Sequence, residues 1–107
     1  MTILSENIEY LVLVEALQKK DPAAFSVFYD RYAAAFYGDI KRAIYKQAES
    51  DAILEVALCS IWKSVGQFDP EQEHLFTWAL KKVRKEISRV KVDMVLKAIF
   101  ACQQSMY

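Results

Sequence analysis

Residues 67–91, QFDPEQEHLFTWALKKVRKEISRVK, combine a helix-start signal with a long amphipathic pattern. Asp69 suits an N-cap, Pro70 suits the first helical position, and Gln72 suits the reciprocal partner of a capping box. Apolar residues follow at alternating steps of four and three, which keeps one face of a helix toward a core. These residues are Phe76, Leu80, Val83, Ile87, Val90 and Met94. The pattern predicts a helix over about 70–92.

The opposite face of this predicted helix carries an indole followed by three cations: Trp78, Lys82, Lys85 and Arg89. Between Lys81 and Lys91, six basic residues accompany one acid, Glu86, which gives a local net charge of +5. The whole chain is neutral, with 14 Lys and Arg against 14 Asp and Glu, so the asymmetry is local. Such a face would attract an anionic partner, and the alternative interpretation is a solvated helix surface.

The remaining sequence also favours helices, because only two Gly and two Pro interrupt the 107 residues. Asp21 and Pro22 form a second helix-start signal, and Gly66 is a candidate helix stop. The predicted helices cover about 6–20, 22–45, 51–65 and 70–92. We expect an all-α fold, a compact bundle of four to five helices in a single domain with its core in about 8–92. Residues 93–107 form a C-terminal helical extension that either prolongs the fourth helix or folds back as a fifth.

The apolar spacing of each segment predicts which side chains form the core. The second, third and fourth helices are expected to supply Phe25, Phe28, Tyr32, Leu58, Ile61, Leu80, Val83 and Ile87. The first helix shows a ragged apolar face, with Ser5 as its candidate cap: Ile8, Leu11, Val12 and Leu17. The polar residues 46–50 predict a break before the third helix.

Catalytic chemistry finds little support in the sequence. The single histidine, His74, has no partner that would complete a nucleophile–base pair, and the isolated Gly38 and Gly66 form no phosphate-binding loop. Cys59 and Cys102 show no metal-ligand spacing. We therefore expect no enzymatic activity, metal or cofactor. No apolar run reaches the roughly 18 residues of a membrane span, so we expect no membrane partner. The two cysteines show no disulfide framework, which favours a reduced cytoplasmic setting.

Several short motifs resemble region two of extracytoplasmic-function (ECF) sigma factors. Asp21-Pro22-Ala23-Ala24-Phe25, followed by Phe28-Tyr29-Asp30-Arg31-Tyr32, is similar to the family pattern D-x-x-A-F-x-x-L-Y-x-x-Y. Ile61-Trp62 with Phe68-Asp69-Pro70 resembles V-W…F-D-P, and Phe76-Thr77-Trp78 before a basic helix resembles F-x-x-W. The match covers about Leu11–Val92 in the family's order and spacing. Region four of these factors has no counterpart in the 107 residues, so a fragment and a stand-alone domain both stay open.

The resemblance implies an all-helical transcription-initiation domain that binds core RNA polymerase and holds single-stranded non-template DNA of the promoter −10 element. Carried over by position, the polymerase-binding residues are Glu49, Asp51 and Glu55. The expected nucleic-acid-binding residues are Phe76, Trp78, Lys81, Lys82, Arg84, Lys85 and Arg89. Residues 67–74 correspond to the family loop that cradles a flipped base. An anti-sigma factor is a further partner that the resemblance suggests.

The chain departs from the family pattern at both implied interfaces. In the polymerase-binding helix, Ala52 and Val56 stand where the family has acids. In the promoter-reading segment, Glu73 replaces the usual Gly and Lys85 replaces an Asn. We therefore expect weaker polymerase binding than a typical member shows, and weak base preference.

A second hypothesis is a diverged sigma-like module for protein interaction or dimerisation, without DNA melting. The segment Met94–Tyr107 would supply its apolar surface through Val95, Ile99, Phe100 and Met106. An exposed Trp78 beside an electropositive groove would favour the transcription factor. A C-terminal segment buried in a second copy would favour the interaction module.

Overall fold

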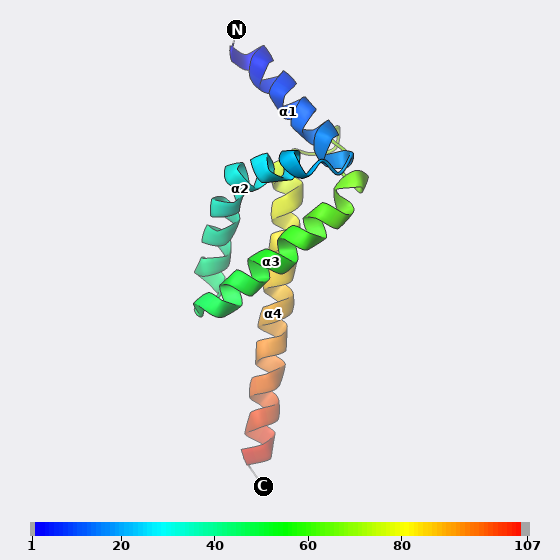
Figure 1. Ribbon diagram of the computed structural model, residues 1–107. Coiled ribbons are helices and arrows are strands. Elements are labelled where there is room, and N and C mark those ends of the chain that lie inside the picture. The colour runs from blue at the N-terminus through cyan, green and yellow to red at the C-terminus, as the bar shows by residue number, and fades with distance from the viewer. Residues whose placement is uncertain (1, 106–107) are drawn as a thin grey trace.

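The computed structural model describes the backbone of residues 2–105 and the side chains of residues 8–104. In this part of the chain there are four α-helices, one 3₁₀ turn and no strand, which confirms the expected all-α fold. The elements are α1 (Thr2–Gln18), α2 (Pro22–Ala43), α3 (Gln47–Ser64), the 3₁₀ turn η1 (Val65–Gln67) and α4 (Leu75–Ser105). Figure 1 shows α2 and α3 against the first half of α4, while α1 and the end of α4 project in opposite directions.

The start of α2 follows the local signal in the sequence. Asp21 is the N-cap, its carboxylate accepts a hydrogen bond from the Ala23 N–H at 3.0 Å, and Pro22 is the first helical residue. A Pro at this position loses no helical hydrogen bond, because the first N–H groups of a helix have no partner within it. This predicted helix start is confirmed.

The preceding helix, α1, ends at Gln18 and is followed by a residue with left-handed backbone geometry, Lys20, whose φ is 64°. The Lys20 N–H donates to the Leu17 carbonyl at 2.9 Å, and the Asp21 N–H donates to the Ala16 carbonyl at 3.0 Å. These two bonds form a Schellman motif, in which the left-handed position usually carries Gly. The end of this helix was predicted from the following Asp21-Pro22, and it lies at Gln18, two residues before the predicted end at Lys20. Because Lys20 is not a Gly, its left-handed geometry has no local signal in the sequence.

The break before α3 is shorter than the sequence predicted, and α3 begins at Gln47 instead of Asp51. Ser50 is fully buried, and its hydroxyl lies 3.2 Å from the Ile44 carbonyl oxygen and 3.0 Å from that of Lys46. This hydroxyl ties the first turn of the helix to the linker, so a polar segment becomes helical. At the other end, Gly66 lies inside η1 without a positive φ, so it is not the expected left-handed stop.

The fourth helix begins at Leu75, so the predicted start at Pro70 is wrong. The Asp69 carboxylate accepts from the Glu71 N–H at 2.9 Å, and the Asp69 carbonyl accepts from the Gln72 N–H at 3.1 Å. These bonds close a turn that does not propagate into a helix. At its other end α4 continues past residue 92 to Ser105, so the C-terminal segment prolongs this helix instead of folding back.

The stripe of α4 side chains that faces the core differs in part from the apolar stripe that the sequence predicted. Leu75, Ala79 and Val83 are fully buried and Ile87 nearly so, at regular steps of four residues. The predicted Phe76, Leu80 and Val90 are only half-buried at the edge of this line, and Met94 is 37 % exposed. Of the other predicted core residues, Phe28 and Ile61 are buried, whereas Phe25, Tyr32 and Leu58 pack half-buried against the core.

Among the side chains of α1 that the structure describes, the buried ones lie in the second half of the helix. Leu13, Val14 and Leu17 are buried, whereas three residues of the predicted apolar face are exposed: Ile8, Leu11 and Val12. The helix begins at Thr2, before the expected cap Ser5, whose side chain lies outside the described residues. The projecting ends make the molecule 68 Å long and 24 × 23 Å across. Its radius of gyration of 17.4 Å exceeds the about 13 Å expected for a globule of this length.

Candidate functional site

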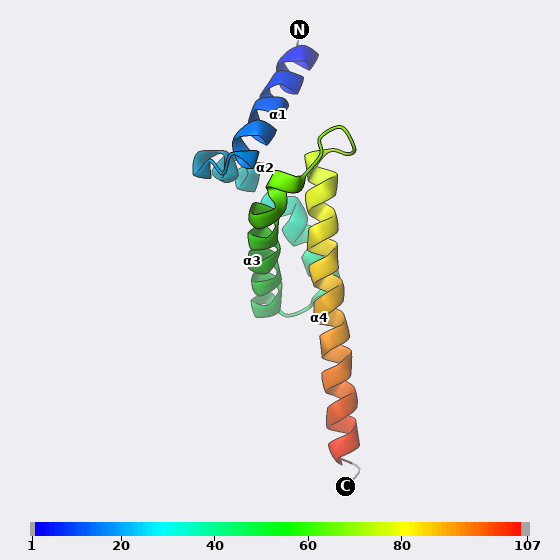
Figure 2. The same ribbon diagram turned by 90° about the vertical axis from the view of Figure 1, so that its right-hand side faces the viewer.

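The loop before α4, residues 68–74, protrudes at the start of that helix in Figure 2, and side chains of α1 hold it in place. Gln18 donates from Nε2 to the Phe68 carbonyl at 2.7 Å, and its second contact is the Val65 carbonyl at 3.3 Å. The Phe68 ring is buried in the core, so the first residue of the loop is anchored there. No local pattern in the sequence indicates this anchor, because Gln18 lies 50 residues before Phe68.

The end of the loop is fixed by two side chains at the first turn of α4. The Tyr10 hydroxyl accepts from the Leu75 N–H at 2.8 Å, and the His74 Nδ1 accepts from the Phe76 N–H at 3.0 Å. The Tyr10 and His74 rings stack at 4.4 Å. Together the two residues satisfy N–H groups that a helix start leaves without partners. His74 therefore has a structural role in capping α4.

Trp78 lies directly beside this loop. Its ring packs against the Phe68 ring at 5.3 Å between centroids, and the Lys82 Nζ lies 4.8 Å from its centroid. Trp78 and Lys82 are half-buried, whereas Lys85 and Arg89 are exposed. The predicted basic face therefore lies on the flank of α4, beside the buried stripe that begins at Leu75. It does not lie on the side of the helix opposite the core.

Phe76, expected to contact nucleic acid, takes part in the packing of α2 against α4. Its ring stacks on Phe36 at 5.5 Å and 10°, and contacts Tyr32 at 5.3 Å. Phe76 and Trp78 are both half-buried, so their partners distinguish them. Phe76 packs against two rings of α2, whereas Trp78 packs against the Phe68 ring at the start of the loop and lies beside the Lys82 ammonium.

Three cations of the basic segment are paired with acids. Lys81 Nζ lies 2.5 Å from Glu73, Arg84 Nε lies 2.9 Å from Asp39, and Arg89 Nη2 lies 2.6 Å from Glu86. The other three show no ion pair within the described part of the chain: Lys82, Lys85 and Lys91. The positive surface is therefore smaller than the local charge of the sequence suggests.

Asp39 forms ion pairs with two arginines. It accepts from Arg84 of α4 and from Arg42 one turn further along α2. The hydrogen bond from Arg84 lowers the pKa of the Asp39 carboxyl below its usual value, and Arg42 acts in the same direction. Asp39 stays ionised and ties α2 to α4, so Arg84 has an intramolecular partner that the local sequence does not reveal.

The three acids expected to contact polymerase differ in how they are presented on α3. Glu55 is exposed, and Asp51 is exposed but accepts a hydrogen bond from the Tyr37 hydroxyl at 2.7 Å, which raises the pKa of Tyr37. Glu49 is half-buried, and its Oε2 is buried without a hydrogen-bond partner among the described residues. The structure thus brings Asp51 and Glu55 to the surface but not the whole Glu49 side chain.

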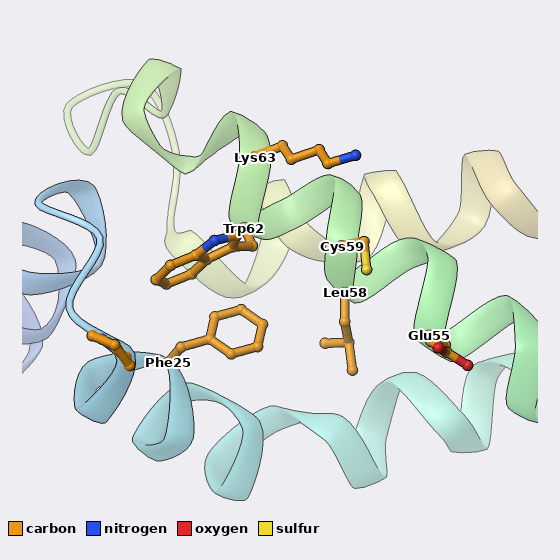
Figure 3. A pocket seen from close by; sticks show the side chains of 7 residues that line it. Phe25, Glu55, Leu58, Cys59, Trp62 and Lys63 are labelled. Atoms are coloured by element: carbon orange, nitrogen blue, oxygen red, sulfur yellow. The ribbon is translucent and has the colours of Figure 1, made fainter.

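An apolar groove of about 400 Å³ runs beside Glu55, between α3 and the start of α2 (Figure 3). Figure 3 shows Phe25 of α2 facing Leu58 and Trp62 of α3 across it. The Trp62 ring meets the Phe25 ring edge-on at 5.1 Å, and the Lys20 Nζ lies 5.1 Å from the indole centroid. Trp62 therefore supports α3 by joining it to the start of α2, while keeping part of its surface open.

Two other kinds of site were sought in the described residues. They contain no group of three or more His, Cys, Asp or Glu side chains placed to hold a metal ion. None of the helices within residues 2–105 is both long enough and apolar enough to cross a bilayer.

Similarity to known proteins covers most of the chain. The chain is 27 % identical, over 83 residues or 77 % of its own length, to the ECF RNA polymerase sigma factor SigK of Mycobacterium sp. strain KMS. It is 26 % identical over 82 residues to the protein of the same name from Mycolicibacterium vanbaalenii. The matches span 43 % and 42 % of these relatives, so the chain corresponds to less than half of their length. No family model and no solved structure matches the chain.

The relatives are sigma factors rather than enzymes, which agrees with the absence of a catalytic motif in the sequence. The resemblance that the motifs indicated is thereby confirmed: over about three quarters of its length, this chain is similar to ECF RNA polymerase sigma factors.

Proposed function

We propose that this chain is the region-two-like part of an ECF-type sigma factor, which binds core RNA polymerase and the single-stranded −10 element of a promoter. The observation that carries the proposal is the arrangement around Trp78. Its indole lies against the anchored loop of residues 68–74, and Lys82 and Lys85 follow along the same flank of α4. The proposed partner is an enzyme of the cytoplasm, so the protein acts there.

For DNA, the chemistry of this flank suits a single strand better than a duplex. A base can stack on an indole only when it is unpaired, and such stacking contributes about 1–3 kcal/mol per base. Lys82 and Lys85 are positioned one and two turns beyond Trp78, where they would contact backbone phosphates. Lys81, Arg84 and Arg89 join this interface only where phosphate competes with their carboxylate partners.

For polymerase, the proposed surface is the exposed side of α3. Asp51 and Glu55 would face a basic surface of the clamp, and the groove lined by Trp62 and Leu58 would accept an apolar side chain beside them. Glu49 contributes less, because one of its carboxylate oxygens is buried. We assign no surface to an anti-sigma factor, the further partner that the resemblance suggests.

The decisive experiment measures fluorescence anisotropy of a labelled −10-like single strand, with this chain alone and with core polymerase added. We expect binding that is tighter than to the matching duplex and that weakens as salt rises. Trp78→Ala should weaken it by the loss of one stacked base, about 5- to 150-fold, and leave the salt dependence nearly unchanged. No binding at low salt, even with core polymerase, would contradict the proposal.

The diverged interaction module remains the second candidate, because one observation favours it. The last part of α4 exposes large apolar side chains along its whole length, including Val95, Ile99 and Phe100. The residue that extends this predicted surface further, Met106, lies outside the described residues.

A further inference from the structure

Two segments with exposed apolar side chains, the junction of α1 with α2 and the end of α4, lie toward opposite ends of the molecule. Figures 1 and 2 show these two parts of the ribbon. The first is a groove of about 440 Å³ between α1 and the start of α2. Its lining includes Ile8, Val12 and Val27, of which Val12 is 60 % exposed, and Leu11 is exposed close by along α1. We call it the α1–α2 groove.

The second surface is the end of α4, residues 91–105, which we call the α4 tail. Its side chains are exposed throughout residues 91–104. The large apolar ones are Val92, Met94, Val95, Leu96, Ile99 and Phe100, and Phe100 is 65 % exposed. One side of the helix is polar, where Lys97 pairs with Asp93 at 3.2 Å.

We propose that two copies of this chain associate antiparallel about a two-fold axis, each with its α4 tail in the α1–α2 groove of the other. Because the groove and the tail lie at opposite ends of a 68 Å molecule, reversing one copy brings its tail to the groove of the other. The same rotation brings the second tail to the first groove, so the contact is made twice and closes. The inference uses surfaces that the proposed polymerase and DNA contacts do not use.

Both surfaces are large for a chain of this size. The groove exposes Ile8, Val12 and Val27 by 46–60 %, and the tail exposes six large apolar side chains by 37–65 %. A standard interface buries about 800 Å² per partner, and a contact that is made twice brings both surfaces of each copy into it. The charges also match. Glu9 and Asp21 outweigh Arg31 along the groove, whereas Lys91 and Lys97 outweigh Asp93 on the tail.

The distribution of apolar residues around the tail favours a groove over direct pairing of two tails. Val92, Val95 and Ile99 lie on one face of the helix, while Met94 and Ala98 lie on another. A two-stranded coiled coil buries only a narrow stripe, whereas a helix between two others buries a wider surface. Pairing of two tails would also leave the α1–α2 groove uncovered.

The test is sedimentation equilibrium of the full 107-residue chain across a concentration series. We expect the mass of a dimer at roughly 100 µM, a concentration well above the dissociation constant of a micromolar pair. Val12→Glu in the groove and Phe100→Glu in the tail should each give a monomer with unchanged circular dichroism, because both side chains are exposed in the single copy. The matched control is Val56→Glu on α3, where an equally apolar residue is 47 % exposed away from both surfaces; it should stay dimeric.

A mixture of the two monomeric variants separates this arrangement from others. The Val12→Glu copy has an intact tail and the Phe100→Glu copy has an intact groove, so the mixture should form a weaker heterodimer with one of the two contacts. A monomeric wild-type chain at roughly 100 µM would overturn the proposal. A Val12→Glu variant that still dimerises would also overturn it, in favour of pairing between tails.

Discussion

At the scale of single residues, Phe28 shows how the aromatic spacing of α2 becomes a core. Its ring is fully buried and lies within 5.3–6.0 Å of the rings of Phe25, Tyr32 and Phe36. Removing it leaves a cavity that neighbouring rings fill only in part. We expect Phe28→Ala to lower the free energy of unfolding by about 3–5 kcal/mol, measured by urea denaturation. The neighbouring Tyr29→Ala is the control, because Tyr29 is 45 % exposed and its loss should cost no more than about 0.5 kcal/mol.

The cations of α4 differ residue by residue in whether they are available to a phosphate. Lys85 is exposed without an ion pair in the described structure, whereas the neighbouring Arg84 is held by Asp39. If single-stranded DNA binds this flank, Lys85→Ala should reduce the slope of log affinity against log salt by about 0.7, the share of one phosphate. Arg84→Ala should leave the slope unchanged. Equal slope changes in the two variants would mean that the Asp39 pair opens on binding.

At the scale of elements, α1 acts as the support of the loop before α4. Tyr10 and Gln18 reach this loop from one helix, and the buried Phe68 holds it from the other side. Tyr10→Phe keeps the ring that stacks on His74 but removes the oxygen that accepts from the Leu75 N–H. We expect a loss of about 0.5–1.5 kcal/mol and faster amide hydrogen exchange at Leu75, with exchange in the middle of α3 unchanged. Unchanged exchange at Leu75 would show that this hydroxyl does not cap α4 in solution.

The exposed side of α3 carries the proposed polymerase contact, and Glu55 is its best presented acid. Glu55→Lys should weaken binding in a core polymerase pull-down, because it removes an attraction and adds a repulsion. Glu55→Gln removes the attraction alone and should have a smaller effect in the same direction. Since Glu55 is exposed, neither change should alter the thermal unfolding of the isolated chain. If Glu55→Lys binds as well as the wild type, α3 is not part of the interface.

At the scale of the whole molecule, the sequence predicted what depends on local patterns. The four helices, the Asp21–Pro22 start and the burial of Phe28, Ile61 and Val83 all follow from short-range spacing. The start of α4 was missed because Asp69 closes a turn, and the helix is capped partly by Tyr10, 65 residues before Leu75.

The candidate site shows the same division between local and distant effects. Spacing correctly grouped Trp78, Lys82 and Lys85 on one face of α4, but it placed that face opposite the core, whereas it lies along the flank of the helix. It overestimated the positive charge, because one of the acids that pair with the basic segment, Asp39, lies 45 residues before Arg84. The pairing of Phe76 with Phe36 likewise depends on how α2 packs against α4, which a linear pattern does not contain.

The two projecting ends make one further prediction about the molecule as a whole. The α4 tail adds helix but almost no buried surface, since its side chains are exposed over residues 91–104. We therefore expect a chain that ends after residue 92 to unfold, when dilute and monomeric, within a few degrees of the full chain. Its helical ellipticity per molecule should be lower, because the removed segment is helical. At high concentration the full chain should melt at a higher temperature and the shortened chain should not, because only the full chain gains stability from association. A shortened chain that unfolds cooperatively only at a much lower temperature, even when dilute, would mean that the tail packs against its own core.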